Sequence, residues 1–108
     1  MTDYVEDLHV AGAKADTGKL RAGLVLGGFS RALKAVAEVG TFGANKYTAD
    51  GWLSVPNGLE RYEDAGERHR LDRRTGISHD PESKLLHRAH EAWNALALLE
   101  LELRNAQE

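Results

Sequence analysis

The chain has 108 residues, of which 29% are charged, with a formal net charge of -3 and no cysteine. This length fits one domain with a modest core, so we expect copies to associate into a homo-oligomer. The lack of cysteine excludes disulfides and thiolate metal sites, and the negative balance disfavours binding to duplex nucleic acid. Because no apolar run is long enough for a bilayer and no secretion signal begins the chain, we expect a cytoplasmic protein without membrane contact.

The first part of the chain reads as a polar arm followed by a helix and a loop. Residues 1–18 show no apolar periodicity and predict an arm, disordered or strapped across a partner, before a single nucleotide-binding domain at 19–108. A helix is predicted from Phe29, and Gly40 is expected to end it. Residues 40–56 contain glycines, a proline and three aromatic rings, which predicts a long ordered loop that buries those rings.

Two further helices have recognisable starts. Asn57 is a candidate N-cap with Glu60 as its capping-box partner, which predicts a helix to about Arg73. Asp80 as N-cap, followed by Pro81, predicts another helix that runs to about Arg104. The sequence therefore predicts an all-α fold, a small helical bundle of about three main helices with a long ordered loop after the first.

Two neighbouring stripes run along the last predicted helix. One is apolar at spacings of three and four and is predicted to face the core: Leu86, Ala89, Trp93, Leu96, Leu99 and Leu103. The other begins with His87, His90 and Asn94 before it becomes apolar. If both stripes face the bundle, one end of the interior is polar and needs a hydrogen-bond network or a ligand. Alternatively, the histidines are half-exposed and merely solvate a helix flank.

The preceding helix supplies groups that can meet this polar end. Its stripe through Tyr62 and Gly66 reaches His69, which stands beside Arg68, a candidate phosphate contact. His69, His87 and His90 are the candidate catalytic residues, as a general base or as groups that orient phosphates. His79-Asp80 resembles the metal-binding dipeptide of HD-domain phosphohydrolases, but the N-cap role explains Asp80 without a metal.

Carboxylates on the same two helices are candidate metal ligands, because Mg²⁺ prefers oxygen donors. Residues three apart share a helix face, so facing acidic pairs can hold a divalent ion against a polyphosphate. The alternative is a solvated charged surface with local salt bridges. The candidate metal ligands are Glu60, Glu63, Glu67 and Glu91.

The loop offers a nucleotide contact of its own. Asn45, Lys46 and Tyr47 supply an amide for base edges, an ammonium for phosphate and a ring for stacking. The segment is not a Walker A motif, because the Gly-Lys-Ser/Thr ending is missing.

An ordered set of short motifs extends from Asp16 to about Leu99. The motifs are Asp16-Thr-Gly-Lys19-Leu-Arg21, Thr41-Phe-Gly-Ala-Asn-Lys46-Tyr47, Trp52, Arg68-His69, Asp80-Pro-Glu-Ser83 and His87-x-x-His90-x-x-x-Asn94. This set resembles the phage dATP/dGTP diphosphohydrolase family, which is associated with the MazG-like all-α nucleoside triphosphate pyrophosphohydrolases. The resemblance implies a helical bundle, Mg²⁺ or Mn²⁺, homo-oligomers, and hydrolysis of purine deoxynucleoside triphosphates to monophosphate and pyrophosphate. The expected role is remodelling of the nucleotide pool in the host cytoplasm during infection.

The resemblance also implies a set of nucleotide-binding residues. These are Lys19, Arg21, Asn45, Lys46, Tyr47, Trp52, Arg68 and Asn94. Two minor departures from relatives are Gly27-Gly28 in place of prolines and Lys84 in place of a glycine. A larger one is that Glu91-x-x-Asn94 offers an amide where MazG-like enzymes have a carboxylate, which weakens a Mg²⁺ site.

Two other functions remain open at this stage. A chain that lacks metal carboxylates but has an imidazole-rich pocket fits a non-catalytic phage protein that binds and sequesters a nucleotide second messenger of bacterial immunity. The third interpretation is a protein–protein adaptor in which the histidines form an internal polar network.

Overall fold

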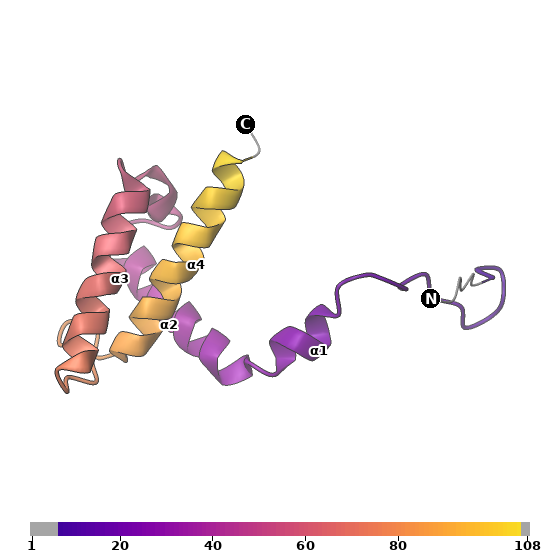
Figure 1. Ribbon diagram of the computed structural model, residues 1–108, viewed down its shortest axis with the longest axis horizontal. Helices are drawn as coiled ribbons and strands as arrows, with labels where there is room; N and C mark the ends of the chain where they lie inside the picture. Colours follow the sequence, from indigo (N-terminus) through magenta and orange to yellow (C-terminus); the bar gives the residue numbers. More distant parts are fainter. Residues whose placement is uncertain (1–6, 107–108) are drawn as a thin grey trace.

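The computed structural model describes residues 7–106, and Figure 1 shows helices joined by turns and irregular segments over this range. The elements are α1 (Ala22–Gly27), α2 (Ser30–Lys46), the 3₁₀ helix η1 (Gly51–Ser54), α3 (Gly58–Arg74) and α4 (His87–Asn105). Within the described range there is no strand, and the isolated antiparallel bridge between His79 and Leu86 forms no sheet. The predicted all-α fold is confirmed, while assembly into a homo-oligomer stays a prediction.

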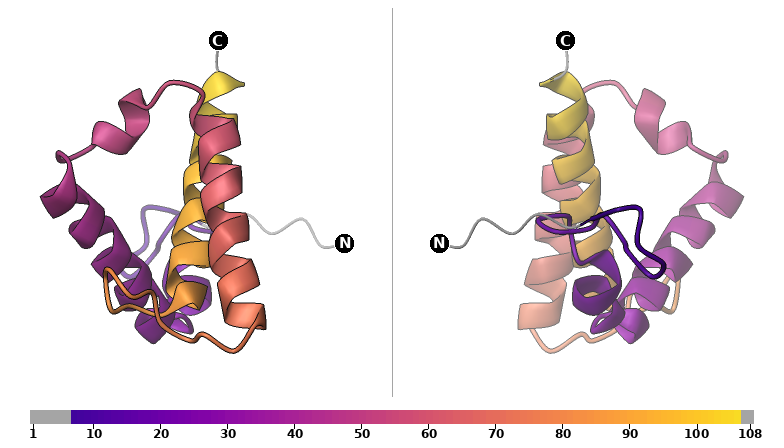
Figure 2. Two further views of the ribbon diagram at one scale, coloured as in Figure 1. Left: turned by 90° about the vertical axis from the view of Figure 1, so that its left-hand side faces the viewer. Right: turned by 90° about the vertical axis from the view of Figure 1, so that its right-hand side faces the viewer.

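The helices α3 and α4 form an antiparallel pair that lies side by side along its length (Figures 1 and 2). A small residue permits this approach, since a Cβ added at Gly66 would stand 3.3 Å from Cβ of Asn94. The helix α2 packs against α4 at an angle, where an added Cβ at Gly40 would stand 3.2 Å from Nε1 of Trp93. The bundle is therefore built around α4, with α3 on one side and α2 on another.

Three aromatic rings join η1 to the helix pair. Trp52 of η1, Tyr62 of α3 and Trp93 of α4 meet edge to face, with ring centroids 5.6 to 6.3 Å apart. The Tyr62 hydroxyl donates a 2.6 Å hydrogen bond to the Trp52 carbonyl oxygen. The ring of Trp52 is thus anchored as predicted, whereas Tyr47 is 72% exposed, so its predicted burial was wrong.

Two predicted helix boundaries were wrong. The helix α2 continues through Gly40 and Gly43 to Lys46, six residues beyond the predicted end, so the ordered loop begins only at Tyr47. Gly40 therefore serves close packing against Trp93 instead of helix termination. The helix α4 begins at His87, seven residues after the predicted N-cap, because the segment from Asp80 forms a separate turn.

The beginning and end of α3 agree better with the sequence. The helix spans Gly58–Arg74, but Asn57 has a left-handed backbone (φ 55°) and makes no capping hydrogen bond with its side chain. The capping box with Glu60 is therefore absent. Gly76 follows the helix with φ 98°, the conformation expected of a terminating glycine.

The face of α4 that was predicted to be the core is buried only in part: Ala89 is buried as predicted, but the leucines of this face are exposed in the single chain. Leu96, Leu99 and Leu103 are each about half exposed, whereas the polar stripe through His87, His90 and Asn94 is buried. The interpretation of those histidines as a solvated flank was wrong. Among the described residues the buried apolar side chains are Val39, Ala89 and Ala97, which is a very small core for a chain of this length.

The segment before α2 has little contact with the helix pair. The run Leu24–Leu26, which periodicity left unclassified, lies in the short helix α1, and its side chains are exposed. Residues 7–18 form turns that extend away from α3 and α4 (Figure 1), while the first six residues of the predicted arm lie outside the described range. Over residues 7–106 no helix combines the length and hydropathy needed to cross a membrane.

Candidate functional site

A tight turn between α3 and α4 carries the candidate site. Oδ2 of Asp80 accepts a 2.7 Å hydrogen bond from the backbone N–H of Ser83, and the Asp80 carbonyl oxygen accepts one from Lys84. The Asp80 N–H donates to the carbonyl oxygen of Leu85, and Lys84 has a left-handed backbone with φ 67°. Asp and Ser favour such local side-chain-to-backbone bonds, so the residues that predicted a helix start fold the turn instead.

Three imidazoles meet beside this turn. His69 of α3 and His87 of α4 approach through their Nδ1 atoms, which are 2.8 Å apart. The ring of His90 stacks on that of His69, with centroids 4.3 Å apart and planes 7° from parallel. Nε2 of His90 lies 2.7 Å from Oγ of Ser83. The histidine cluster, defined as His69, His87 and His90, is therefore tied to the turn as well as to both helices.

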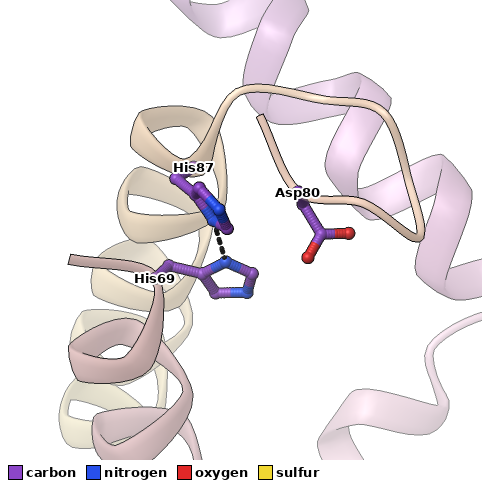
Figure 3. A group of neighbouring side chains, drawn as sticks. All are labelled: His69, Asp80 and His87. Carbon is purple, nitrogen blue, oxygen red and sulfur yellow. Dashed lines mark hydrogen bonds between the residues drawn. The ribbon is translucent and has the colours of Figure 1, made fainter. Parts of the chain in front are cut away.

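The carboxylate of Asp80 faces this cluster. Figure 3 shows it on the segment between α3 and α4, turned toward the imidazoles of His69 and His87. Each of these three residues offers one ligand atom, and the three atoms all lie within 4.8 Å of one another. Among the described residues this is the group of His and acidic side chains that has the spacing to hold a metal ion.

The protonation of the site follows from its burial. Burial lowers the pKa of His69, and the neighbouring His90 lowers it further. Burial likewise lowers the pKa of His90, against the opposing effect of Asp80. At Asp80 burial acts to raise the pKa, but hydrogen bonds from Ser83 and the nearby imidazoles outweigh it, so the pKa is lowered. Near neutral pH the site therefore combines the neutral imidazoles of His69 and His90, which are available as ligands or bases, with the ionised carboxylate of Asp80.

His87 is the most buried member of the cluster. Its side chain is 1% exposed, and its Nε2 atom is buried without a hydrogen-bond partner. Oδ2 of Asp72 on α3 lies 3.9 Å from this atom, beyond hydrogen-bond range. A buried ring nitrogen without a partner is uncommon in folded proteins, which marks His87 as a residue with a role beyond packing.

The donor set fits a divalent ion, but one of a particular kind. Two imidazoles and one carboxylate suit first-row transition metals, whereas Mg²⁺ favours oxygen ligands in a near-ideal octahedron. The lowered pKa of His69 is consistent with a site that binds a cation through a neutral ring. Within the described residues, this fit is better than that of the four acids predicted as ligands.

Those four acids are dispersed over α3 and α4. Glu91 forms a two-pronged pair with Arg73, at 2.6 and 2.9 Å, and this pair lowers the pKa of Glu91. Glu67 is similarly bonded to Arg70. Glu60 and Glu63 are exposed on the first half of α3. Their role as metal ligands stays a prediction, although two of the four have cationic partners already.

The predicted nucleotide-binding residues fall into three places. Near the turn, Lys46 at the end of α2 forms an ion pair with Glu82, Nζ to Oε2 at 2.9 Å, and Asn94 is buried one turn after His90. Asn45, Tyr47 and Arg68 are exposed around this end. Trp52 belongs to the aromatic group described above, and the exposed residues Lys19 and Arg21 lie in the segment before α2.

A shallow groove adjoins the site between α2 and the turn. Its lining is mainly apolar, and Ser83, which contacts His90, forms part of it. The other lining residues are Lys34, Ala37, Glu38, Thr41, Phe42 and Leu85. The groove and the histidine cluster are therefore neighbours that share one residue.

Sequence reasoning missed two residues of this site. Asp80 was assigned to capping, and Ser83 was noted in a motif but given no role. The His79-Asp80 dipeptide was the available signal, and it was set aside because a proline after an Asp is typical of a helix start. Asp72 carried no signal, because its neighbourhood with His87 arises only from the packing of α3 on α4.

The comparison with protein families agrees with this geometry. A family model described as dATP/dGTP diphosphohydrolase, N-terminal, matches residues 9–108, which include every residue of the site. No curated protein and no solved structure matches the chain. A diphosphohydrolase is a hydrolytic enzyme for which a divalent metal is expected, and the site contains a possible His/Asp centre for one. The chain therefore belongs to the dATP/dGTP diphosphohydrolase family and corresponds to its N-terminal region.

Proposed function

We propose that the protein hydrolyses dATP or dGTP to the monophosphate and pyrophosphate with a divalent metal, and that it remodels the nucleotide pool during phage infection. The observation that carries this proposal is the juxtaposition of His69, Asp80 and His87 in a chain of this family. A relation to MazG-like enzymes is part of the proposal, as is action in the host cytoplasm.

The protein groups divide into a metal-binding part and a proton-transferring part. His69, Asp80 and His87 would hold the ion, Mn²⁺ or Mg²⁺, which supplies Lewis-acid stabilisation of phosphoryl oxygens. His90 is the candidate general base, because its lowered pKa leaves the ring neutral at physiological pH. Its Nε2 contacts the Ser83 hydroxyl, which sets the direction of its lone pair or N–H.

The groove beside the turn is the proposed binding place for the base. Phe42 and Leu85 supply apolar contacts for a purine, and Ser83 connects this groove with the histidine cluster. A nucleotide lying in this direction would bring its phosphates past Lys46, whose ammonium is at present paired with Glu82. Lys46 would then exchange a carboxylate for a phosphate, as charge-assisted pairing allows.

A second function is supported by the same imidazoles. A protein that binds and sequesters a nucleotide second messenger needs phosphate contacts but neither a general base nor a metal ion. The acids predicted as metal ligands include two that are bound to arginines, which favours binding without cleavage if the His/Asp group takes no metal.

Turnover distinguishes the two functions. The protein is incubated with purine and pyrimidine deoxynucleoside triphosphates and with cyclic and ADP-ribose-type signalling nucleotides, in Mg²⁺ or Mn²⁺. Products are separated by chromatography before and after heat denaturation. New monophosphate and pyrophosphate in equal amounts support the enzyme, whereas ligand that is depleted and then recovered intact on heating supports sequestration.

A matched pair of variants links the result to the site. His90→Gln removes the proposed base, and His9→Gln changes an exposed histidine in the segment before α1. We expect turnover to fall about 10²-fold or more in the first variant, the usual contribution of a general base, and to be unchanged in the second. Equal turnover in both variants would exclude His90 as the base.

A further inference from the structure

The contact between His69 and His87 leaves one ring nitrogen of His87 without a hydrogen-bond partner, whichever ring carries the shared proton. Their Nδ1 atoms, 2.8 Å apart, form a hydrogen bond only if one ring carries its proton on Nδ1 and the other does not. If Nδ1 of His87 donates, its Nε2 is a buried acceptor without a donor. If Nδ1 accepts, its Nε2–H is a buried donor without an acceptor.

Asp72 is placed to resolve the second case. It lies on α3, its side chain is 54% exposed and free to change rotamer, and its Oδ2 is 3.9 Å from Nε2 of His87. A shift of about 1 Å would bring the pair within the usual hydrogen-bond distance. A carboxylate in this position stabilises the Nε2–H tautomer and so leaves the Nδ1 lone pair of His87 directed at His69.

A metal ion that replaces the proton between the two rings would meet the Nδ1 lone pairs of both imidazoles beside a carboxylate. Nitrogens bound at about 2.1 Å to a tetrahedral ion stand roughly 3.4 Å apart, so the rings would separate slightly from their observed 2.8 Å contact. The Asp80 oxygen lies within 4.8 Å of both imidazole ligand atoms and carries the negative charge that the rings lack.

We propose that His69, Asp80 and His87 bind a first-row transition-metal dication in preference to Mg²⁺, and that Asp72 is the positioning residue that holds His87 in the required tautomer. The preference follows from the ligands, since imidazole nitrogen suits later first-row ions such as Zn²⁺ and Co²⁺, whereas Mg²⁺ favours oxygen. The inference deepens the proposed function, because the site is the same. It is nevertheless tested without nucleotide.

Direct metal titration is the first experiment. The full chain is freed of metal with a chelator and titrated with Zn²⁺, Co²⁺, Mn²⁺ and Mg²⁺ by calorimetry, with Co²⁺ also followed by its visible absorption. We expect one ion per chain, binding of Co²⁺ and Zn²⁺ tighter than that of Mn²⁺, and Mg²⁺ weaker than each by at least 10-fold. Equal or tighter binding of Mg²⁺ would overturn the proposal.

Variants identify the residues. His69→Gln and Asp80→Asn are expected to abolish the Co²⁺ absorption, whereas Asp64→Asn, at an exposed acid of α3 outside the candidate ligands, is expected to leave it unchanged. Loss of the Co²⁺ absorption in the variant of the exposed acid alone would place the metal at acidic surface residues and overturn the proposal. Because His87 is fully buried and its variant is prone to misfold, the exposed Asp72 gives the independent test.

Asp72→Asn is expected to weaken Co²⁺ binding about 10- to 100-fold, as found for outer carboxylates of metal-bound histidines. Asp72→Glu is expected to restore most of this loss. Nitrogen-15 NMR of the imidazoles should show His87 protonated at Nε2 in the metal-bound wild type. A His87 tautomer and a Co²⁺ affinity that Asp72→Asn leaves unchanged would exclude the positioning role.

The two proposals fail separately. Metal binding to these residues with no nucleotide turnover would retain the site and contradict the enzyme. Turnover that persists in His69→Gln and Asp80→Asn would retain the enzyme and contradict the site.

Discussion

Replacing Lys84 by glycine should stabilise the protein. Lys84 is exposed and has a left-handed backbone at φ 67° in the turn that presents Asp80 and Ser83. That conformation costs a residue with a side chain roughly 1–2 kcal/mol. Glycine avoids this cost but loses about 0.5–1 kcal/mol because its unfolded chain is freer. The difference predicts a net gain of about 0.5–1 kcal/mol in the free energy of unfolding for Lys84→Gly.

The matched control is Lys84→Ala, which removes the same charge and the same side chain but keeps a Cβ. Urea unfolding followed by circular dichroism should show a higher midpoint for the glycine variant alone, and its thermal midpoint should rise by roughly 2–6 °C. Equal midpoints for the two variants would refute the backbone argument. A loss of stability in Lys84→Gly would show that the turn does not have the left-handed residue found here.

Three other predictions concern pH, the acidic residues and assembly. Because burial lowers the pKa of His69 and His90, the unfolded chain binds more protons than the folded chain below about pH 6.5. The free energy of unfolding should therefore fall as the pH is lowered from 7 to 5. Urea titrations at each pH measure this free energy, and a flat profile would contradict the prediction. Glu63→Gln and Glu91→Gln should both keep metal-dependent turnover. The unfolding midpoint should fall mainly in Glu91→Gln, because that variant loses the ion pair with Arg73. A variant that loses turnover but keeps the stability of the wild type would support these acids as metal ligands. Leu99→Lys, on the exposed leucine face of α4, should reduce the mass measured by light scattering from that of an oligomer to that of a monomer, and a monomeric wild type at the same concentration would refute the prediction.

Periodicity and terminators predicted the class of fold but misplaced two boundaries. Gly76 ends α3 because its φ of 98° needs a residue without a Cβ. Gly40 carries the same sequence signal but lies inside α2, where the absence of a Cβ makes room for Trp93. The two uses of glycine differ only in tertiary packing, which one sequence does not display.

The candidate site was predicted in part, for a comparable reason. The spacing of His87, His90 and Asn94 predicted one buried polar stripe, and its burial is confirmed. The leucines on the adjacent stripe were expected to be buried with it, but α3 covers only the polar side in the single chain. The site role of Asp80 was not predicted, because an Asp is typical of both a helix N-cap and an Asx turn. The two differ only in the backbone conformation of the residues that follow, and here the Asp80 side chain bonds the N–H of Ser83 in a turn.

The aromatic group that joins η1 to α3 and α4 gives this protein an optical probe of its own. Both tryptophans of the chain lie in it, Trp52 and Trp93, with ring centroids 5.8 Å apart. Trp93 is also one helical turn beyond His90, so its emission senses the charge and polarity of that region. Unlabelled fluorescence can therefore follow both the docking of η1 and the arrival of a ligand at the histidines. Trp52→Phe would separate the two signals, since the emission that remains comes from Trp93 alone.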